Sequence, residues 1–259
     1  MLGAIAGDVI GSPYERSPIK RKDFALFSAA SCFTDDTVMT IAIADALNTK
    51  ASFTDKLKEW YKRYPHVGYG MTFAKWAAHP TDRDPYHSWG NGSAMRVSPI
   101  AWAFNALDDV LIWAKASAEV THDHPEAIAG ACAVAGCIFI ARKGETKQGI
   151  RSFASSFGYK FEKTLEQIRP SYSFDVSCSG SVPQAIIAFL ESTSFEDAIR
   201  NAVSLGGDSD TQACIAGAIA EAFYGGVPPV IRAITIGCLD EDLKRVVDVS
   251  LSKWQRMLT

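Results

Sequence analysis

Apolar residues recur along this chain mainly at the three- and four-residue spacing that is typical of amphipathic helices. The spacing is clear over Asp36–Asn48 and over Pro125–Arg142, and it predicts a helix in each segment. The same period predicts further helices at Ala94–Leu107, Val110–Val120, Pro183–Glu191, Phe195–Leu205, Thr211–Tyr224 and Asp242–Met257. Alternating strand-like stretches are scarce and no βαβ order is present, so we expect an all-α fold.

Prolines mark two of the expected helix starts. Pro125 precedes Glu126, and proline in a first helical turn with an acid beside it is favourable, because proline needs no hydrogen bond there and the acid faces the positive helix end. Pro183 is expected to open a helix in the same manner. The longest stretches without a clear period are Tyr64–Pro85 and Ser171–Ser181, which we expect to be loops.

The composition is that of a globular protein. Hydrophobic residues make up 47% of the 259 positions and charged residues 21%, which excludes disorder, collagen-like repeats and coiled coil. No composition break or repeat divides the chain, so we expect a single compact multi-helix domain over residues 1–259. With a net charge of −3 there is no basic excess, and we expect no broad nucleic-acid surface.

The cysteines and the apolar stretches indicate a cellular compartment. The six cysteines form no CxxC pair, which favours free, buried thiols in a reducing environment. The N-terminal stretch lacks a basic region and reaches Asp8 too early for a signal peptide. No apolar stretch approaches the roughly 20 residues of a membrane span. We therefore expect a cytoplasmic monomer that binds no membrane.

Two acidic clusters stand immediately before predicted helices. They are Thr34–Thr37 (TDDT) and Asp208–Thr211 (DSDT). Asp and Thr are good helix caps, but a cap needs only one oxygen side chain and each cluster supplies two carboxylates and a hydroxyl. Carboxylates packed this closely repel unless a cation lies between them, and Mg²⁺, Mn²⁺ and Ca²⁺ prefer such oxygen ligands. Two such helix ends that converge would supply a two-metal centre.

Three further segments could carry chemistry. Glu15 follows Gly7–Gly11 and adds a fifth carboxylate, either a metal ligand or general base or a solvated loop side chain. Gly90–Arg96 (GNGSAMR) is a glycine-rich turn of the kind that cradles phosphate, although it lacks the lysine of a P-loop and follows no strand. Thr121–His124 (THDH) places a His-Asp pair before Pro125, as in an HD-type phosphohydrolase or as polar residues at a helix end.

Taken together, these segments resemble the ADP-ribosylglycohydrolases, a family that includes the dinitrogenase-reductase-activating glycohydrolase and the ADP-ribosylhydrolases of animals. The resemblance rests on motifs in the family's order from about residue 3 to about residue 226. They are Gly7-Asp8 with Gly11 and Glu15, then Thr34–Thr37, Gly90–Arg96, Thr121–Glu126 and Gly206–Thr211.

The resemblance implies an all-α hydrolase with two Mg²⁺ ions, or Mn²⁺, in a cleft. It would remove ADP-ribose from a modified protein or another acceptor, such as an arginine or serine side chain, by cleaving the glycosidic bond at C1 of the proximal ribose. The implied metal ligands are Thr34, Asp35, Asp36, Asp208, Asp210 and Thr211. The implied catalytic residues are Glu15, reaching in from a mobile loop, and Asp36. The implied substrate-binding residues are Asn91, Gly92, Ser93, Met95 and His122.

The sequence departs from the family pattern in two places. Ser181 follows Cys178-Ser179-Gly180, where many relatives have an aromatic residue near the substrate, and Glu221–Tyr224 alters a glycine-rich ending. An aromatic wall for adenine must then come from elsewhere, and the candidates by location are Phe73, Trp76, Tyr86 and Trp89.

Two alternatives remain open at this point. One is an HD-type metal phosphohydrolase centred on His122-Asp123, which would need further histidines among the five in the chain, such as His66, His79 and His87. The other is a catalytically silent ADP-ribose-binding or structural protein of the same fold. The intact acidic clusters argue against a silent site.

Overall fold

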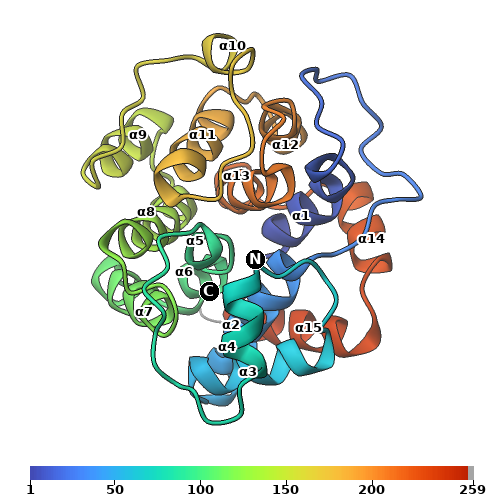
Figure 1. Ribbon diagram of the computed structural model, residues 1–259. Coiled ribbons are helices and arrows are strands. Elements are labelled where there is room, and N and C mark those ends of the chain that lie inside the picture. Colours follow the sequence, from blue (N-terminus) through green and yellow to red (C-terminus); the bar gives the residue numbers. More distant parts are fainter. Residues whose placement is uncertain (256–259) are drawn as a thin grey trace.

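Helix α13 (Ser209–Phe223) forms the centre of the molecule (Figure 1). In the computed structural model, which describes residues 1–255, every residue of α13 from Ser209 to Ala222 is buried. Four helices pack directly on it: α1 (Leu2–Glu15), α8 (Pro125–Arg142), α11 (Cys178–Leu190) and α12 (Phe195–Val203). A helix that is apolar on nearly all sides needs such complete cover to fold.

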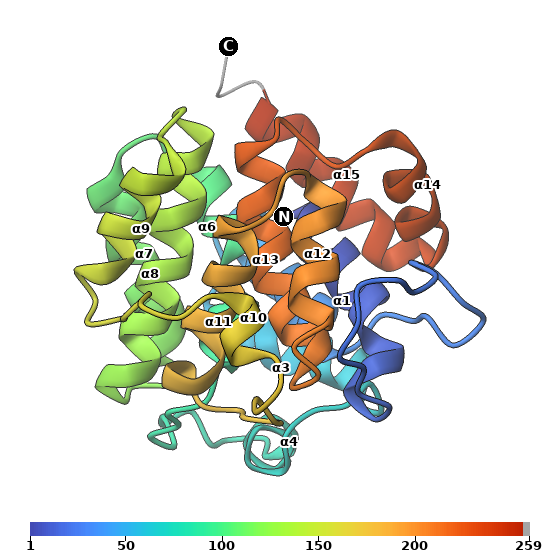
Figure 2. The same ribbon diagram turned by 90° about the horizontal axis from the view of Figure 1, so that it is seen from above.

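The remaining helices form two flanks around this centre. In Figure 2, α7 (Leu107–Glu119), α8 and α9 (Lys147–Ser155) lie on one side, and α14 (Pro229–Gly237) and α15 (Glu241–Gln255) lie on the other. The other elements are α2 (Asp35–Thr49), α3 (Phe53–Arg63), α4 (Met71–Ala78), α5 (Gly92–Met95), α6 (Ser98–Ala103) and α10 (Leu165–Ile168).

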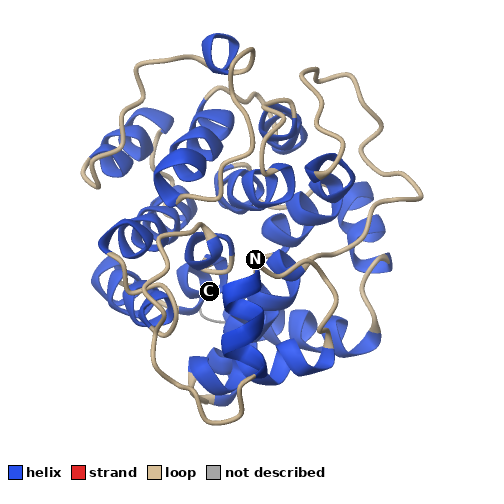
Figure 3. Ribbon diagram, viewed as in Figure 1, coloured by secondary structure: helices blue, strands red, loops and turns tan. Residues whose placement is uncertain are grey.

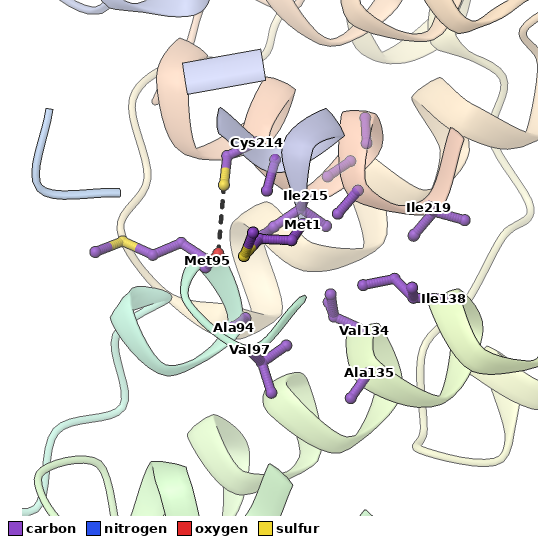
Figure 4. Packing of buried hydrophobic residues seen from close by; sticks show 14 of the residues in the cluster. Met1, Ala94, Met95, Val97, Val134, Ala135, Ile138, Cys214, Ile215 and Ile219 are labelled. Atoms are coloured by element: carbon purple, nitrogen blue, oxygen red, sulfur yellow. Dashed lines mark hydrogen bonds between the residues drawn. The ribbon is translucent and has the colours of Figure 1, made fainter. Parts of the chain in front are cut away.

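The all-α prediction is confirmed within residues 1–255. Figure 3 shows only helices and loops there, and the one β-type feature is an isolated antiparallel bridge between Gly90 and Ser177. The helices form one compact domain with a continuous core. Figure 4 shows part of this core, where Met1, Ile215 and Ile219 face Val134 and Ile138 of α8.

Helices α1 and α13 touch along their backbones, because glycines line the contact. A Cβ placed on Gly7 would lie 2.0 Å from the Ala213 carbonyl oxygen, and one on Gly3 would lie 2.3 Å from the Gly217 carbonyl oxygen. Real side chains do not tolerate such distances, so only glycine fits. The close approach fixes the C-terminal end of α1 beside the N-terminal end of α13.

Most of the predicted helices are present, with two corrections. Pro125 does open α8, where the His124 side chain caps the helix by accepting from the Glu126 N–H. The prediction that Pro183 opens a helix is wrong: α11 begins at Cys178 after the cap of Ser177, and Pro183 lies inside it. The predicted helix Ala94–Leu107 is broken into α5 and α6, because Pro99 has no N–H to continue the ladder and its ring would clash with the Met95 carbonyl.

The periodicity misses several helices. It does not predict α1, α3, α4, α9, α10 or α14. Helix α4 lies within the expected loop Tyr64–Pro85, and α11 begins within the expected loop Ser171–Ser181. Glu15, expected in a loop, is the last residue of α1. The predicted end of the final helix at Met257 lies outside the described residues.

The cysteines and the most apolar helix bear on the expected environment. All six cysteines are free, and four are buried: Cys132, Cys137, Cys178 and Cys214. Helix α8 has the length and composition of a membrane span, with 18 residues and a mean hydropathy of 1.4. However, 67% of it is buried inside the fold, where it contacts α7 and α13, as the core helix of a globular protein does.

Candidate active site

The two acidic clusters predicted from the sequence meet at one cavity. Helices α2 and α13 point their N-terminal ends at each other, and the C-terminal end of α1 lies between them. The cavity there has a volume of about 490 Å³. Its lining includes ten of the predicted site residues: Glu15, Asp35, Asp36, Asn91, Gly92, Met95, His122, Asp208, Asp210 and Thr211.

Local structure explains how each carboxylate reaches the cavity. Thr34 caps α2 by accepting from the Asp36 N–H at 3.3 Å, which places Asp35 and Asp36 in the first turn. Asp208 precedes α13, but its carboxylate forms no capping hydrogen bond to the helix backbone. It accepts instead from Asn91 Nδ2 at 2.7 Å. The side chain of Asp208 is therefore directed toward the cavity wall rather than used as a cap.

Asp8 is a site residue that the sequence reasoning did not select. It is completely buried on α1, and its carboxylate accepts hydrogen bonds from the backbone and the hydroxyl of Thr34 and of Thr37. Asp8 thereby holds the start of α2 against α1. The signal was present as a single acid inside the apolar segment GAIAGDVIG, where only a specific role explains a charge.

The carboxylates form two groups that share one member. Ligand oxygens of Asp8, Asp36 and Asp210 lie within 4.8 Å of one another, and so do those of Glu15, Asp208 and Asp210. Thr211 Oγ1 donates to Asp36 Oδ2 at 3.1 Å and so joins the first group. The two groups thus contain five acids and share Asp210, and Asp35 lines the same cavity as a sixth acid.

Burial and mutual repulsion disfavour negative charge here. Burial raises the pKa of Asp8 to about 6. Burial and the charges of Asp8 and Asp208 raise the pKa of Asp35 to about 8. Burial also raises the pKa of each of the four remaining acids, which are Glu15, Asp36, Asp208 and Asp210. The charges of neighbouring carboxylates raise the pKa of Glu15, Asp36 and Asp210 further. All six groups would hold charge more readily beside a cation.

The donor set fits divalent metal ions with oxygen ligands. Within residues 1–255, no Lys or Arg side chain forms an ion pair with any of the six acids. Asp36 Oδ1 is buried and has no hydrogen-bond partner there. An unpartnered buried carboxylate oxygen among other acids is suited to bind a divalent ion, and the two groups of oxygens fit two such ions.

The glycine-rich turn forms one wall of the cavity, but its backbone is used differently from expectation. The Gly90 N–H donates to Ser88 Oγ at 3.2 Å and the Asn91 N–H to the Val176 carbonyl at 2.8 Å. These two N–H groups are therefore not free to cradle a phosphate. They tie the turn to the segment before α11 and direct the Asn91 side chain at Asp208.

Two buried basic side chains, Arg96 and His122, also line the cavity. Arg96 is 1% exposed, and its Nη2 donates to the Ser117 carbonyl at 2.9 Å and to Thr121 Oγ1 at 2.8 Å, whereas its Nε has no hydrogen-bond partner within residues 1–255. The His122 ring borders the cavity beside Gly92, and its Nδ1 shares a hydrogen bond with Thr121 Oγ1. Burial and the Arg96 charge hold the pKa of His122 well below its usual range, so this imidazole is neutral.

Three predicted side chains lie elsewhere. Thr34 was expected to be a metal ligand, but its hydroxyl donates to Asp8 and the residue does not line the cavity. Its hydroxyl oxygen instead caps α2. Ser93 is buried and donates to the Ala127 carbonyl at 2.9 Å, away from the substrate space it was expected to cover. Trp76, a candidate for the aromatic wall, packs behind Phe73 and is 3% exposed. Ser181, the departure from the family pattern, is buried and accepts from Asn91 Nδ2.

The rim of the cavity is aromatic and apolar. Phe73, Tyr86 and Trp89 line it as expected by location, and Phe174 and Met71 join them without having been predicted. Trp89 and Phe174 are each about half exposed, so flat apolar faces remain open beside the acids.

The His-Asp pair does not form a metal site. His122 and Asp123 diverge, since Asp123 binds His87 at 2.7 Å while His122 faces Thr121. The groups of potential metal ligands in the described part of the chain contain only acids. This geometry disfavours the HD-type alternative.

Comparison with known proteins agrees with this geometry. ADP-ribosylhydrolase ARH3 of Bos taurus is 27% identical over 305 residues, covering 87% of this chain and 84% of that protein. ADP-ribosylarginine hydrolase Tri1 of Pseudomonas putida (strain GB-1) is 28% identical over 273 residues, covering 88% and 71%. A solved structure described as an ADP-ribosylglycohydrolase-related protein complex shares the fold, with a TM-score of 0.73 and 23% identity over 98% of this chain and 96% of that one. The sequence model of ADP-ribosylglycohydrolases matches residues 1–255, and the chain belongs to the ADP-ribosylglycohydrolase family.

Proposed function

We propose that this protein is a divalent-metal-dependent hydrolase that releases ADP-ribose from a modified acceptor by cleaving the glycosidic bond at C1 of the proximal ribose. The observation that carries the proposal is the pair of carboxylate groups that share Asp210 at one cavity. A purely structural or binding protein has no need to bury four acids and partly bury two more without a cationic partner, because their burial costs stability.

The residues that would hold two Mg²⁺ or Mn²⁺ ions are those whose oxygens face the cavity. They are Asp35, Asp36, Asp208, Asp210 and Thr211, with Glu15 at the edge of the second group. Bound divalent ions would supply charge neutralisation and Lewis acidity at the sugar hydroxyls.

The chain's own groups account for the rest of the chemistry. Glycosidic cleavage builds positive charge on the ribose ring, and the surrounding carboxylates stabilise that charge. Glu15 ends α1 and is half-buried beside Asp208, where burial and the Asp208 charge raise its pKa. A carboxylate with a raised pKa accepts a proton more readily, so Glu15 is the residue that deprotonates the attacking water. Asp36, the other residue expected to be catalytic, is hydrogen-bonded to Thr34 and Thr211 and is better placed as a metal ligand than as the general base.

The proposal does not specify the acceptor, which is the group that carries the ADP-ribose. The relatives include one named for arginine-linked ADP-ribose, and the aromatic faces at this cavity mouth suit an arginine guanidinium and other flat or apolar groups alike, so they select no single acceptor. Serine-linked and other ADP-ribosylated groups therefore stand beside arginine as substrates.

A turnover panel tests the proposal. Arginine-, serine- and nucleic-acid-linked ADP-ribose would be incubated with the protein in Mg²⁺, in Mn²⁺ and in EDTA, and free ADP-ribose would be measured. We expect release from at least one substrate with metal and none with chelator. Binding of ADP-ribose without any release would leave a silent binding protein, and release that persists in EDTA would refute the metal dependence.

A further inference from the structure

The cavity lining holds only three side chains that can carry positive charge: His87, Arg96 and His122. Arg96 is 1% exposed, and its Nη2 is already bonded to the Ser117 carbonyl and to Thr121 Oγ1, so it is far less accessible to a ligand than His87. The ring of His122 is neutral in its buried position. A ligand with a diphosphate therefore finds one available cationic partner in this lining, which is His87.

His87 lies at the mouth of the cavity with its imidazole oriented by a carboxylate. Its side chain is 79% exposed, and its Nδ1 lies 2.7 Å from Asp123 Oδ2. No other hydrogen bond of this imidazole is found within residues 1–255, so Nε2 is open to a ligand. The second oxygen of Asp123, Oδ1, is buried without a partner, so the carboxylate acts on His87 alone.

The backbone of His87 is strained. Its φ is 56°, and within residues 1–255 the only other non-glycine residue with positive φ is Lys50 at a helix end. Such a conformation costs free energy for any residue other than glycine, and it persists where a side chain is needed at that position. Histidine is thus kept in a backbone position that glycine would occupy without strain.

The adjacent turn offers an anion only part of its backbone. The N–H groups of Gly90 and Asn91 already bind Ser88 and Val176, so they offer a phosphate little. An imidazole whose Nδ1 donates to a carboxylate presents Nε2 outward, and an anionic ligand favours the cationic form in which Nε2 is an N–H donor.

We propose that His87, positioned by Asp123, binds the diphosphate of the ADP-ribose unit at the cavity mouth and is the principal side-chain determinant of affinity for it. The inference rests on the proposed function, because it assumes that ADP-ribose enters this cavity. His87 is a binding residue, and Asp123 is a positioning residue that acts through it.

His87→Gly tests this without endangering the fold, because glycine relieves the strain at positive φ. Affinities for ADP-ribose and for adenosine, which has no phosphate, would be measured by calorimetry in saturating Mg²⁺. Loss of one charge-assisted hydrogen bond should weaken ADP-ribose binding about ten-fold and leave adenosine binding unchanged. The matched control is Lys50→Gly, which relieves the same strain at an exposed position outside the cavity and should leave both affinities unchanged.

Asp123→Asn separates positioning from packing. Asparagine can still accept from Nδ1 but carries no charge, so we expect a smaller loss of ADP-ribose affinity, about three-fold, with adenosine again unaffected. If the His87-Asp123 pair had a purely structural role, both His87→Gly and Asp123→Asn would have lower melting temperatures. Both variants would then also bind ADP-ribose and adenosine more weakly, to an equal extent.

The outcomes separate the two hypotheses. If wild-type protein binds ADP-ribose and His87→Gly binds it equally well, the assignment of His87 is overturned while the proposed function stands. If wild-type protein neither binds nor releases ADP-ribose, both fail together.

Discussion

Asp208 and Asp210 do more than cap α13: Asp210 Oδ1 accepts from the Thr211 N–H at 3.0 Å, yet both residues also line the cavity. A capping aspartate accepts hydrogen bonds from backbone N–H groups in the first turn, but Asp208 accepts from the Asn91 side chain. Asp210 lies within both carboxylate groups, and burial together with the charges of Asp36 and Asp208 raises its pKa. At this position the chain accepts a loss of stability in exchange for closely spaced ligands.

Asp210→Asn should have opposite effects with and without metal. Asparagine keeps the shape but removes a charge that a divalent ion requires, so metal affinity should fall by at least about ten-fold, and hydrolysis with it. In chelator the same change relieves repulsion with Asp36 and Asp208, so the melting temperature should rise. Paired melting curves in EDTA and in saturating Mg²⁺, with an activity assay, measure both effects.

The control for this variant is Asp109→Asn. Asp109 is an exposed acid in the first turn of α7, away from the cavity, and the same change there should alter stability by only a few tenths of a kcal/mol in either condition. If Asp210→Asn and Asp109→Asn had the same effect on metal affinity and on the melting temperatures, Asp210 would be excluded as a metal ligand.

Glu15→Gln should separate catalysis from binding. Glutamine keeps the size of the side chain but cannot take a proton from water, so kcat should fall by about 10²–10⁴-fold. Affinity for free ADP-ribose should stay within about three-fold, because no proton transfer occurs in binding. Calorimetry and single-turnover kinetics test this, and an affinity loss that matches the rate loss would make Glu15 a binding residue.

At the residue scale, the sequence predicts which acids meet but not how they are supported. The clusters Asp35-Asp36 and Asp208-Asp210 could be found because paired acids before a helix exceed what capping needs. Asp8 could not be assigned, since its role depends on hydrogen bonds to Thr34 and Thr37 across a helix contact. Thr34 and Ser93 fit their motifs, but competing local acceptors take their hydroxyls.

At the element scale, the contact of α1 with α13 sets the separation of the acids they carry. Gly7→Ala should be destabilising by at least about 1–3 kcal/mol, because its Cβ would meet the Ala213 backbone and force the helices apart. Asp8 and Glu15 would move with α1, so metal affinity should also fall. Thermal melting and a metal titration measure the two effects.

Gly237→Ala in α14 is the matched control for this helix contact. A Cβ on Gly237 meets no atom within 4 Å, so alanine there should be neutral or slightly stabilising. If the two alanine variants melted alike, the glycine contact would not be what holds α1 against α13.

Helix prediction succeeded where periodicity and capping agree and failed where tertiary contacts decide. Helix α8 was predicted because its apolar run follows Pro125. The pattern does not reveal α1, because its glycines disfavour an isolated helix and its apolar residues surround the whole axis. Tertiary contacts stabilise this helix, above all its close packing against α13. The break between α5 and α6 is a local effect of Pro99 that a purely hydrophobic pattern does not detect.

At the scale of the whole molecule, a net charge of −3 conceals a dense concentration of acid in one place. The pKa of Asp8 is raised to about 6 and that of Asp35 to about 8, so the metal-free folded state binds more protons than the unfolded chain between about pH 4 and pH 8. In metal-free protein these groups therefore stabilise the fold less as pH rises through that range. Metal binding must displace the same protons.

Stabilisation by Mg²⁺ should consequently increase with pH. The free energy of unfolding in saturating Mg²⁺ minus that in EDTA should be larger at pH 8 than at pH 6.5, by up to about 1.4 kcal/mol per pH unit for each proton displaced. Taking this difference cancels the titration of groups that metal binding does not affect. A difference that is independent of pH would show that the ions do not bind these acids.

The pairing of α1 with α13 has a consequence for the order in which the molecule assembles. Asp8 and Asp210 are brought together across most of the length of the chain, so their shared site has a very high contact order. During synthesis, α1 would emerge from the ribosome long before its groove exists, with its apolar surface exposed to solvent and to other chains. We therefore expect the hydrolytic centre to be among the last parts of the protein to form, and newly made chains to depend on chaperones until α13 has been translated.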